Sequence, residues 1–241
     1  AASDVYKRQD VFKSDIYIFS LDATYILSSK KSKRQEQAEL PVKTRIADYA
    51  ELHCITNFSF LRGASFPEEL VDRANRLGYE AIAITDECSV SGVVRAHTAA
   101  KESGIKLIIG SEFLLSDGCQ IVLLATNKVG YGQLCHLITC SRRYAEKGDY
   151  FVDKSMIEEN SLADCIVLWV PDLVKKDGLI HNEASWLKCQ FKDRLWIAVE
   201  LFMRGDDQLR LRRLEKLGLN LKIPLCAAGG VYMHDVGRRI L

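Results

Sequence analysis

From residue 48 onward, short apolar runs alternate with segments in which apolar residues recur every three or four positions. The runs have the length and β-branched content of strands, and they lie at 49–54, 81–85, 106–109, 121–125, 165–170, 195–201 and 224–228. Helical spacing lies between them, at 65–77, 89–103, 130–147 and 206–217. Strands that alternate with helices indicate βαβ units, so we predict an α/β fold with parallel strands. Seven strands favour a closed or nearly closed (β/α) barrel, and a doubly wound sheet is the alternative.

Helix boundaries are marked by capping residues. Ser65 and Glu68 have the spacing of a capping box, and Pro67 suits the first turn, where its missing N–H is not needed. Gly78 follows the last periodic residue of this helix, which is typical of a left-handed C-terminal cap. By the same rule, we expect the three later helices to end at glycines, which are Gly104, Gly148 and Gly218.

Polar side chains follow several of the predicted strands. They are His53, Asp86, Glu87 and Glu112, followed late in the chain by Tyr232 and His234. In a parallel barrel the carboxyl ends of the strands meet at one rim, so we expect these groups to converge. A histidine among carboxylates can bind zinc or manganese and activate water for phosphoester hydrolysis. Because these groups also cap helices and form ion pairs, a purely structural role remains open for each.

Composition adds limits to this picture. The 241 residues are 48% hydrophobic and 27% charged, which is ordinary for a globular protein. No apolar run is long enough to cross a membrane, and the eight cysteines contain no C-x-x-C pair. We therefore expect buried, reduced thiols and a cytoplasmic location. Residues 48–241 hold 24 basic and 26 acidic side chains, so they lack the basic excess of a domain that grips phosphates alone.

The first 47 residues follow a different pattern. Residues 4–9 (Asp-Val-Tyr-Lys-Arg-Gln) resemble the translated end of a transposon used in sequencing-library preparation, so we interpret 1–9 as adaptor sequence. Residues 10–47 contain a basic, serine-rich run and are interpreted as a linker or translated upstream sequence. The alternative is that this basic run contacts nucleic acid.

Longer strings of residues now carry a resemblance. They are 49–54 (Tyr-Ala-Glu-Leu-His-Cys), 57–65 (Asn-Phe-Ser-Phe-Leu-Arg-Gly-Ala-Ser), 77–89, 109–112 (Ile-Gly-Ser-Glu), 196–200 and 230–234 (Gly-Val-Tyr-Met-His). This set resembles the PHP (polymerase and histidinol phosphatase) domain at the N-terminus of bacterial C-family DNA polymerases, and above all their error-prone, translesion subfamily. The likeness covers 48–241 and is most specific between 49 and 112. It implies a PHP-type distorted barrel, cut before the polymerase core.

The departures from the metal-binding pattern of that family are as informative as the matches. The pattern begins H-x-H, and here the second position is Ile55. Arg62 stands where the replicative branch has an aspartate, and Glu87 replaces the histidine of a T-D-H motif. The late D-x-H pair falls on Gly230 and Tyr232. His53, Asp86 and Glu112 remain as weak metal candidates, so the resemblance implies the remnant of a metal site, with zinc or manganese bound weakly or not at all.

A fixed positive charge near the rim suggests a replacement for the metal. We hypothesise that Arg62 pairs with Asp86 or Glu112. The remaining histidines are interpreted structurally, with His97 in the core, His136 in the core or packed along its helix, His181 in a loop, and His234 either at the surface or in the site. The three tryptophans, 169, 186 and 196, are expected in the core.

Three functions are open at this point. The first, which we favour, is the PHP domain of an error-prone DNA polymerase. By resemblance, the parent protein uses DNA, dNTPs and Mg²⁺ through a core downstream, with a sliding clamp and mutagenesis accessory proteins as partners. The fragment alone would then be structural, with no catalytic residue. The alternative is an active metal-dependent phosphoesterase or 3′–5′ exonuclease, and the third reading is a free-standing binding module.

Overall fold

The computed structural model describes residues 49–240, and the predictions made for residues 1–47 lie outside that range. Seven strands form one sheet in the order of the sequence, β1 to β7. Their bounds are β1 Ala50–Glu51, β2 Ala81–Ile84, β3 Lys106–Leu114, β4 Gln120–Ala125, β5 Cys165–Val170, β6 Leu195–Val199 and β7 Leu225–Ala227. All neighbours pair in parallel except β4, which is antiparallel to both β3 and β5.

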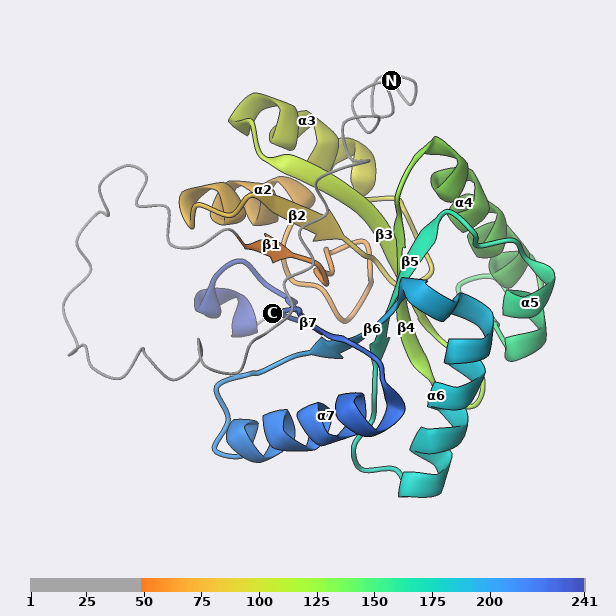
Figure 1. The fold of residues 1–241 in the computed structure, drawn as a ribbon. Helices are drawn as coiled ribbons and strands as arrows, with labels where there is room; N and C mark the ends of the chain where they lie inside the picture. Colours follow the sequence, from red (N-terminus) through yellow and green to blue (C-terminus); the bar gives the residue numbers. More distant parts are fainter. Residues whose placement is uncertain (1–48, 241) are drawn as a thin grey trace.

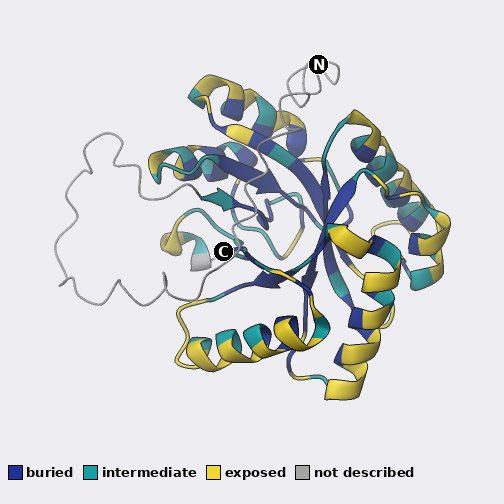
Figure 2. Ribbon diagram, in the orientation of Figure 1, coloured by how far each residue is buried: buried dark blue, intermediate teal, exposed yellow. Residues whose placement is uncertain are grey.

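Helices cover the outside of this sheet (Figure 1). They are α2 Pro67–Arg76, α3 Val93–Ser103, α4 Lys128–Arg143, α5 Lys154–Glu159, α6 Asp177–Phe191 and α7 Asp207–Leu221, with short 3₁₀ turns η3 Lys192–Arg194 and η4 Val236–Ile240. Their outward faces are exposed and the strands are buried (Figure 2). This is the arrangement expected when each helix turns one apolar stripe toward a sheet.

The sheet is closed by a segment that follows β7. The backbone N–H of Val231 donates to the carbonyl of His53 at 2.9 Å, and the N–H of Ile55 donates to the carbonyl of Val231 at 2.8 Å. These two bonds make a parallel bridge between Cys54 and Val231. The result is a nearly closed barrel, which confirms the predicted fold class, with β4 as the one strand that departs from the predicted parallel arrangement.

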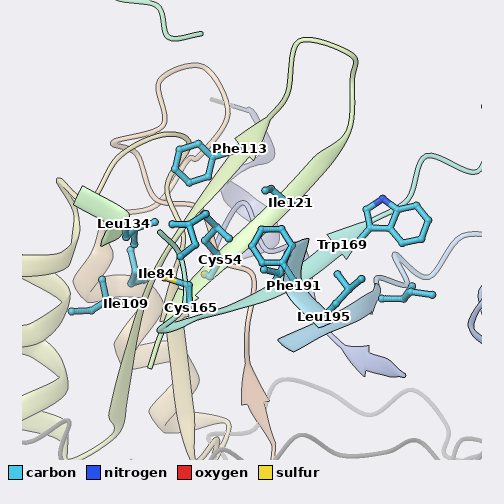
Figure 3. Packing of buried hydrophobic residues seen from close by; sticks show 14 of the residues in the cluster. Cys54, Ile84, Ile109, Phe113, Ile121, Leu134, Cys165, Trp169, Phe191 and Leu195 are labelled. Atoms are coloured by element: carbon cyan, nitrogen blue, oxygen red, sulfur yellow. The ribbon is translucent and has the colours of Figure 1, made fainter. Parts of the chain in front are cut away.

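Two apolar layers hold the barrel together. The larger layer lies between the strands and the helices and includes Ile84, Ile109, Phe113, Leu134 and Trp169 (Figure 3). The smaller layer faces inward from alternate strand positions, and its members include Leu52, Ala83, Val122, Leu168 and Ala198. Alternation of this kind follows from the two-residue period of a strand, in which successive side chains point to opposite faces.

Several helix boundaries differ from those predicted. The helix α2 begins one residue later than expected, and its N-terminal bond runs from the backbone N–H of Phe66 to the carboxylate of Glu69 at 2.9 Å. The capping box at Ser65–Glu68 was therefore wrong by one position. The helix α3 begins at Val93 rather than near 89, and Val94 points outward. The helix α4 ends at Arg143, before Gly148.

At α7 the prediction failed for a packing reason. We expected Gly218 to end this helix, but the helix continues to Leu221. A Cβ added at Gly218 would lie 2.3 Å from the Leu225 side chain, so this glycine permits close approach of the helix to β7. The helix α6 was not predicted, because its apolar stripe is weak and many of its positions are polar.

Cysteines and the remaining histidines were predicted with mixed success. Five of the eight cysteines are buried, and no disulfide joins any pair within residues 49–240. His97 is half-buried on α3. His136 is exposed on α4, with its Nε2 3.6 Å from Sγ of Cys140, so it packs along its helix and not in the core. His181 lies within α6 and not in a loop. Trp169 is fully buried, while Trp186 and Trp196 are half-buried at the edges of the two layers.

Candidate functional site

A buried histidine at the carboxyl end of the barrel binds two carboxylates. His53 follows β1, and its Nδ1 lies 2.5 Å from Oε1 of Glu200 while its Nε2 lies 2.8 Å from Oε2 of Glu112. Glu112 lies in β3 and Glu200 follows β6, so three separate strands bring these groups together. All three residues are buried. Both ring nitrogens of His53 are therefore occupied by protein groups.

An arginine from the loop after β1 completes this cluster. Nη1 of Arg62 donates to Oε1 of Glu112 at 2.5 Å and to Oε2 of Glu87 at 2.7 Å, and Nη2 donates to Oε2 of Glu112 at 3.2 Å. The guanidinium carbon also lies 5.9 Å from the centre of the Tyr232 ring. Because a guanidinium matches a carboxylate with two parallel donors, Arg62 holds Glu112 in one orientation.

Charge pairing shifts the pKa values inside the cluster. Burial alone would lower the pKa of His53, but its bonds to Glu112 and Glu200 raise it to about 9. Burial would raise the pKa of Glu112, yet His53 and Arg62 lower it to about 2. His53 is therefore a cation at neutral pH, and the cluster contains two cations among the carboxyl groups of Glu87, Glu112 and Glu200.

Asp86 lies apart from Arg62 and has a different role. Its carboxylate accepts hydrogen bonds from the backbone N–H and the hydroxyl of Thr56 and from the hydroxyl of Ser59, at 2.8 to 3.0 Å. Burial raises its pKa, and these hydrogen bonds partly offset the rise. Asp86 thus holds the start of the loop after β1, and the hypothesised pairing of Arg62 is seen with Glu112 but not with Asp86.

Glu87 connects the cluster to the loop that follows α4. Its Oε1 accepts a hydrogen bond from the hydroxyl of Tyr150 at 2.8 Å, while Oε2 binds Arg62. Arg142 lies behind this pair, where it donates to the backbone carbonyls of Glu87 and Cys88, both at 3.2 Å. The position of Glu87 is therefore fixed from two sides.

A further buried carboxyl group, that of Glu51, contacts the backbone of His53. Oε1 of Glu51 accepts from the backbone N–H groups of His53 at 3.0 Å and Gly229 at 2.7 Å, and Oε2 accepts from the hydroxyl of Tyr49 at 3.0 Å. Burial raises the pKa of Glu51, and the three donors partly counter it. This side chain ties β1 to the closing segment after β7.

The positions that depart from the metal-binding pattern lie around the same cluster. Ile55 is buried and offers no donor atom to a metal. Gly230 adopts a left-handed backbone with φ of 57°, and a Cβ there would lie 3.0 Å from the carboxylate of Glu200. Tyr232 flanks Arg62, whereas His234 points away and contacts the hydroxyl of Ser65 at 2.8 Å. Among residues 49–240, no three His, Cys, Asp or Glu side chains are arranged to hold one metal ion.

Sequence reasoning missed four members of this network. Glu200 lies in the matched string 196–200, near the end of the strand predicted at 195–201, but the sequence prediction does not assign it to the site. Glu51 lies in a predicted strand in which polar and apolar residues alternate, so nothing in the local sequence marks it as a buried member of the site. Tyr150 and Arg142 reach the cluster from a loop and a helix, and only the folded arrangement reveals them.

Comparison with known proteins agrees with this architecture. Residues 51–184 match the PHP domain family, which is more than half of the chain. The chain belongs to the PHP domain family. The resemblance stated from the sequence is thereby confirmed, and the barrel is a PHP fold.

Two relatives of similar sequence carry the same name. The chain is 53% identical over 195 residues to the error-prone DNA polymerase of Methylococcus capsulatus and 50% identical over 198 residues to that of Dechloromonas aromatica. The matched segments cover 81% and 80% of this chain, but only 18% and 19% of those polymerases. The chain thus corresponds to about a fifth of the length of these relatives.

Solved structures share the fold at low sequence identity. An amidohydrolase from Chromobacterium violaceum is 16% identical, with a TM-score of 0.55 over 79% of this chain and 89% of its own. A two-domain protein from Bacteroides vulgatus, which contains a predicted PHP-like metal-dependent phosphoesterase, is 17% identical with a TM-score of 0.53, over 85% of this chain and 58% of its own. Identities this low show the fold alone. No helix within residues 49–240 has the length and apolar character to cross a membrane.

Proposed function

We propose that this chain is the PHP domain of an error-prone DNA polymerase and that it has a structural role in which internal cations stand in place of a metal. The observation that carries the proposal is the Glu112–His53–Glu200 bridge, in which both ring nitrogens of the histidine are bound within the protein. Arg62 adds a second cation against Glu112. The charge that a dication would supply is thus already present.

The residues do not fit a metal ion. A histidine ligand must offer a free ring nitrogen, and His53 has none free. The guanidinium of Arg62 lies among the carboxyl groups, where it would repel a dication. Asp86 is turned toward Thr56 and Ser59, so it does not join His53 and Glu112 in one ligand set. An active phosphoesterase or exonuclease would need such a set.

Metal analysis tests this part of the proposal. The 241-residue chain is dialysed with excess Zn²⁺ or Mn²⁺, washed and analysed for bound metal, beside a His53→Gln variant as the matched control. We expect both proteins to hold the same low amount, well below one equivalent. A tightly held equivalent that disappears in the His53→Gln variant would overturn the structural role and favour the phosphoesterase.

The parent activity follows from the relatives. The error-prone DNA polymerases that this chain matches support a parent protein that extends primers with dNTPs, with Mg²⁺ held by a separate core, and that works in the cytoplasm where bacterial DNA lies. A sliding clamp and mutagenesis accessory proteins are its proposed partners. For a test, the matched segment of the Methylococcus capsulatus polymerase is replaced by residues 49–241. We expect this chimera to extend primers, whereas an inactive chimera beside an active parent enzyme would contradict the proposal.

A further inference from the structure

Helix α4, on the outside of the barrel, carries an imidazole and a thiol side by side (Figure 1). His136 is exposed, and Cys140, one turn later, is half-buried. Residues four apart in a helix lie on the same face, and Nε2 of His136 lies 3.6 Å from Sγ of Cys140. Among the eight cysteines, Cys140 alone has a histidine one helical turn away. The pair is separate from the buried cluster around His53.

The separation of these two atoms suits a zinc ion. Zinc binds a histidine nitrogen at about 2.0–2.1 Å and a cysteine sulfur at about 2.3 Å, with tetrahedral geometry. Two such bonds at about 109° place the nitrogen and the sulfur about 3.6 Å apart. The distance from Nε2 to Sγ equals this value. A weak thiol hydrogen bond fits the same distance, and zinc would replace it with release of the thiol proton to solvent.

Two further ligands must come from outside α4. Within residues 49–240, no third His, Cys, Asp or Glu side chain joins this pair. A second copy of the chain offers the same pair, and a two-fold axis through the ion would complete a tetrahedron of two thiolates and two imidazoles. The two thiolates would balance the charge of the zinc ion. This neutrality matters because the exposed Arg143 lies one turn beyond Cys140 on the same side of the helix.

We propose that His136 and Cys140 form half of a zinc site, and that a second copy of this chain supplies the other half. The proposed function does not depend on this site. The surface of α4 beside the pair allows a second helix to come close. Gly132 lies one turn before His136, and a Cβ added there would have nothing within 4 Å. Val129, three residues earlier on the same stripe, is 60% exposed, so contact between two such stripes would bury apolar surface near the axis.

Zinc titration of the reduced 241-residue chain, followed by sedimentation velocity, tests the proposal. The test variants are His136→Gln and Cys140→Ser. The matched controls are His181→Gln and Cys189→Ser on α6, because these residues are also exposed but lie about 12 Å apart along the helix axis, too far to share an ion. Cobalt is a second probe, since a bond between Co²⁺ and a thiolate has its own absorption band in the near ultraviolet.

We expect the chain to dimerise as zinc rises to one ion per two chains, and to return to a monomer when EDTA is added. Each test variant should weaken zinc binding by at least about a hundredfold, because it removes a ligand from both halves of the site. The α6 controls should bind zinc and dimerise as the unchanged chain does. The cobalt–thiolate band should disappear in Cys140→Ser and persist in Cys189→Ser. Without zinc, all four variants should keep the melting temperature of the unchanged chain.

Zinc binding that is equal in the test variants and the α6 controls would overturn the inference, as would a dimer that forms without zinc. One zinc per monomeric chain would overturn the shared site. Half an equivalent that survives in His53→Gln and is lost in Cys140→Ser would support it. The reverse, with zinc lost from His53→Gln and kept by Cys140→Ser, would place the ion in the barrel and would overturn this inference together with the structural role proposed for the buried cluster.

Discussion

The guanidinium of Arg62 donates to both carboxylate oxygens of Glu112, at 2.5 Å and 3.2 Å. Glu112 is almost completely buried, whereas the Arg62 side chain is 29% exposed. The arginine therefore closes the cluster on its solvent side. Because the opposite side of Glu112 binds His53, this carboxylate has cations on two sides in a poorly solvated place.

Removal of the arginine should destabilise the domain. In Arg62→Ala, Glu112 and Glu87 lose their shared cation, and a buried carboxylate is left with His53 alone. We expect a loss of about 2–4 kcal/mol in the free energy of unfolding. For a domain of this size that lowers the melting temperature by about 4–16 °C, measurable by thermal denaturation.

A surface pair provides the control for this experiment. Arg76 and Asp72 form an ion pair on α2 in which both side chains are largely exposed. Arg76→Ala should change the free energy of unfolding by about 0.5 kcal/mol or less, because solvent screens such pairs. Equal melting temperatures for Arg62→Ala and Arg76→Ala would contradict a stabilising role of the arginine in the site.

Stability should fall as the pH rises from neutral toward alkaline values. His53 faces Glu112 and Glu200, with Arg62 beyond Glu112, and its pKa is raised to about 9 in the folded protein. A raised pKa stabilises the fold fully below the ordinary value near 6.5, and this contribution is lost as the pH passes about 9. The loss should be about 3 kcal/mol, seen as a lower urea midpoint at about pH 9 than at about pH 6.

At acid pH the dependence is reversed, and stability should fall as the pH falls. The pKa of Glu112 is lowered to about 2, so its contribution is complete above about 4.5 and disappears as the pH falls through about 2. The two shifts report one interaction from its two partners, and their energies are not added. A His53→Gln variant should show a flatter alkaline slope, and a slope equal to that of the unchanged protein would exclude His53 as its source.

Gly230 should tolerate no side chain. A Cβ at Gly230 would lie 3.0 Å from the Glu200 carboxylate and 3.2 Å from Phe202, on a backbone with φ of 57°. Gly104 is a control that separates backbone strain from crowding, since its φ is 79° and nothing lies within 4 Å of the added Cβ. Gly104→Ala should cost about 1 kcal/mol from the backbone, and Gly230→Ala about 2–3 kcal/mol. Urea denaturation of both variants provides the comparison, and equal losses would mean that crowding at Glu200 contributes nothing.

Arg142 should hold the loop after α4. It donates to the carbonyls of Gly148 and Asp149 at 3.3 Å, in addition to those of Glu87 and Cys88. Arg142→Ala should speed amide exchange across 145–151 and cost about 2–3 kcal/mol in the free energy of unfolding. Arg143→Ala, at the exposed neighbouring position, is the control. A loop that exchanges equally in both variants would show that Arg142 does not restrain it.

The elements that could be predicted from the sequence are those with a strong local signal. The runs at 81–85 and 165–170 are continuous apolar segments, and they became β2 and β5. The antiparallel direction of β4 could not be predicted, because apolar runs carry no sign of direction. The first strand shrank to Ala50–Glu51, since its later residues bridge to Val231 far along the chain.

The sequence predicted that the polar side chains at the strand ends lie close together, but it did not predict which of them bind one another. His53, Glu87, Glu112 and Arg62 do meet at one rim, as strand-end positions in a barrel require. Asp86 also lies at the end of a strand, but its carboxylate binds the nearby hydroxyl groups of Thr56 and Ser59 and does not bind Arg62. Which carboxylate an arginine binds depends on the reach of its side chain and on competing donors. Spacing along the chain gives no information on either.

Closure of the barrel has a consequence for synthesis on the ribosome. The carboxylate of Glu51 accepts a hydrogen bond from Gly229, 178 positions later, and the backbone carbonyl of His53 accepts one from Val231. At typical elongation rates this interval lasts on the order of ten seconds or more. Through that time the nascent first strand has an open edge, and Glu51 lacks one of its three hydrogen-bond donors. The domain can therefore reach its native state only after nearly its whole length has left the ribosome.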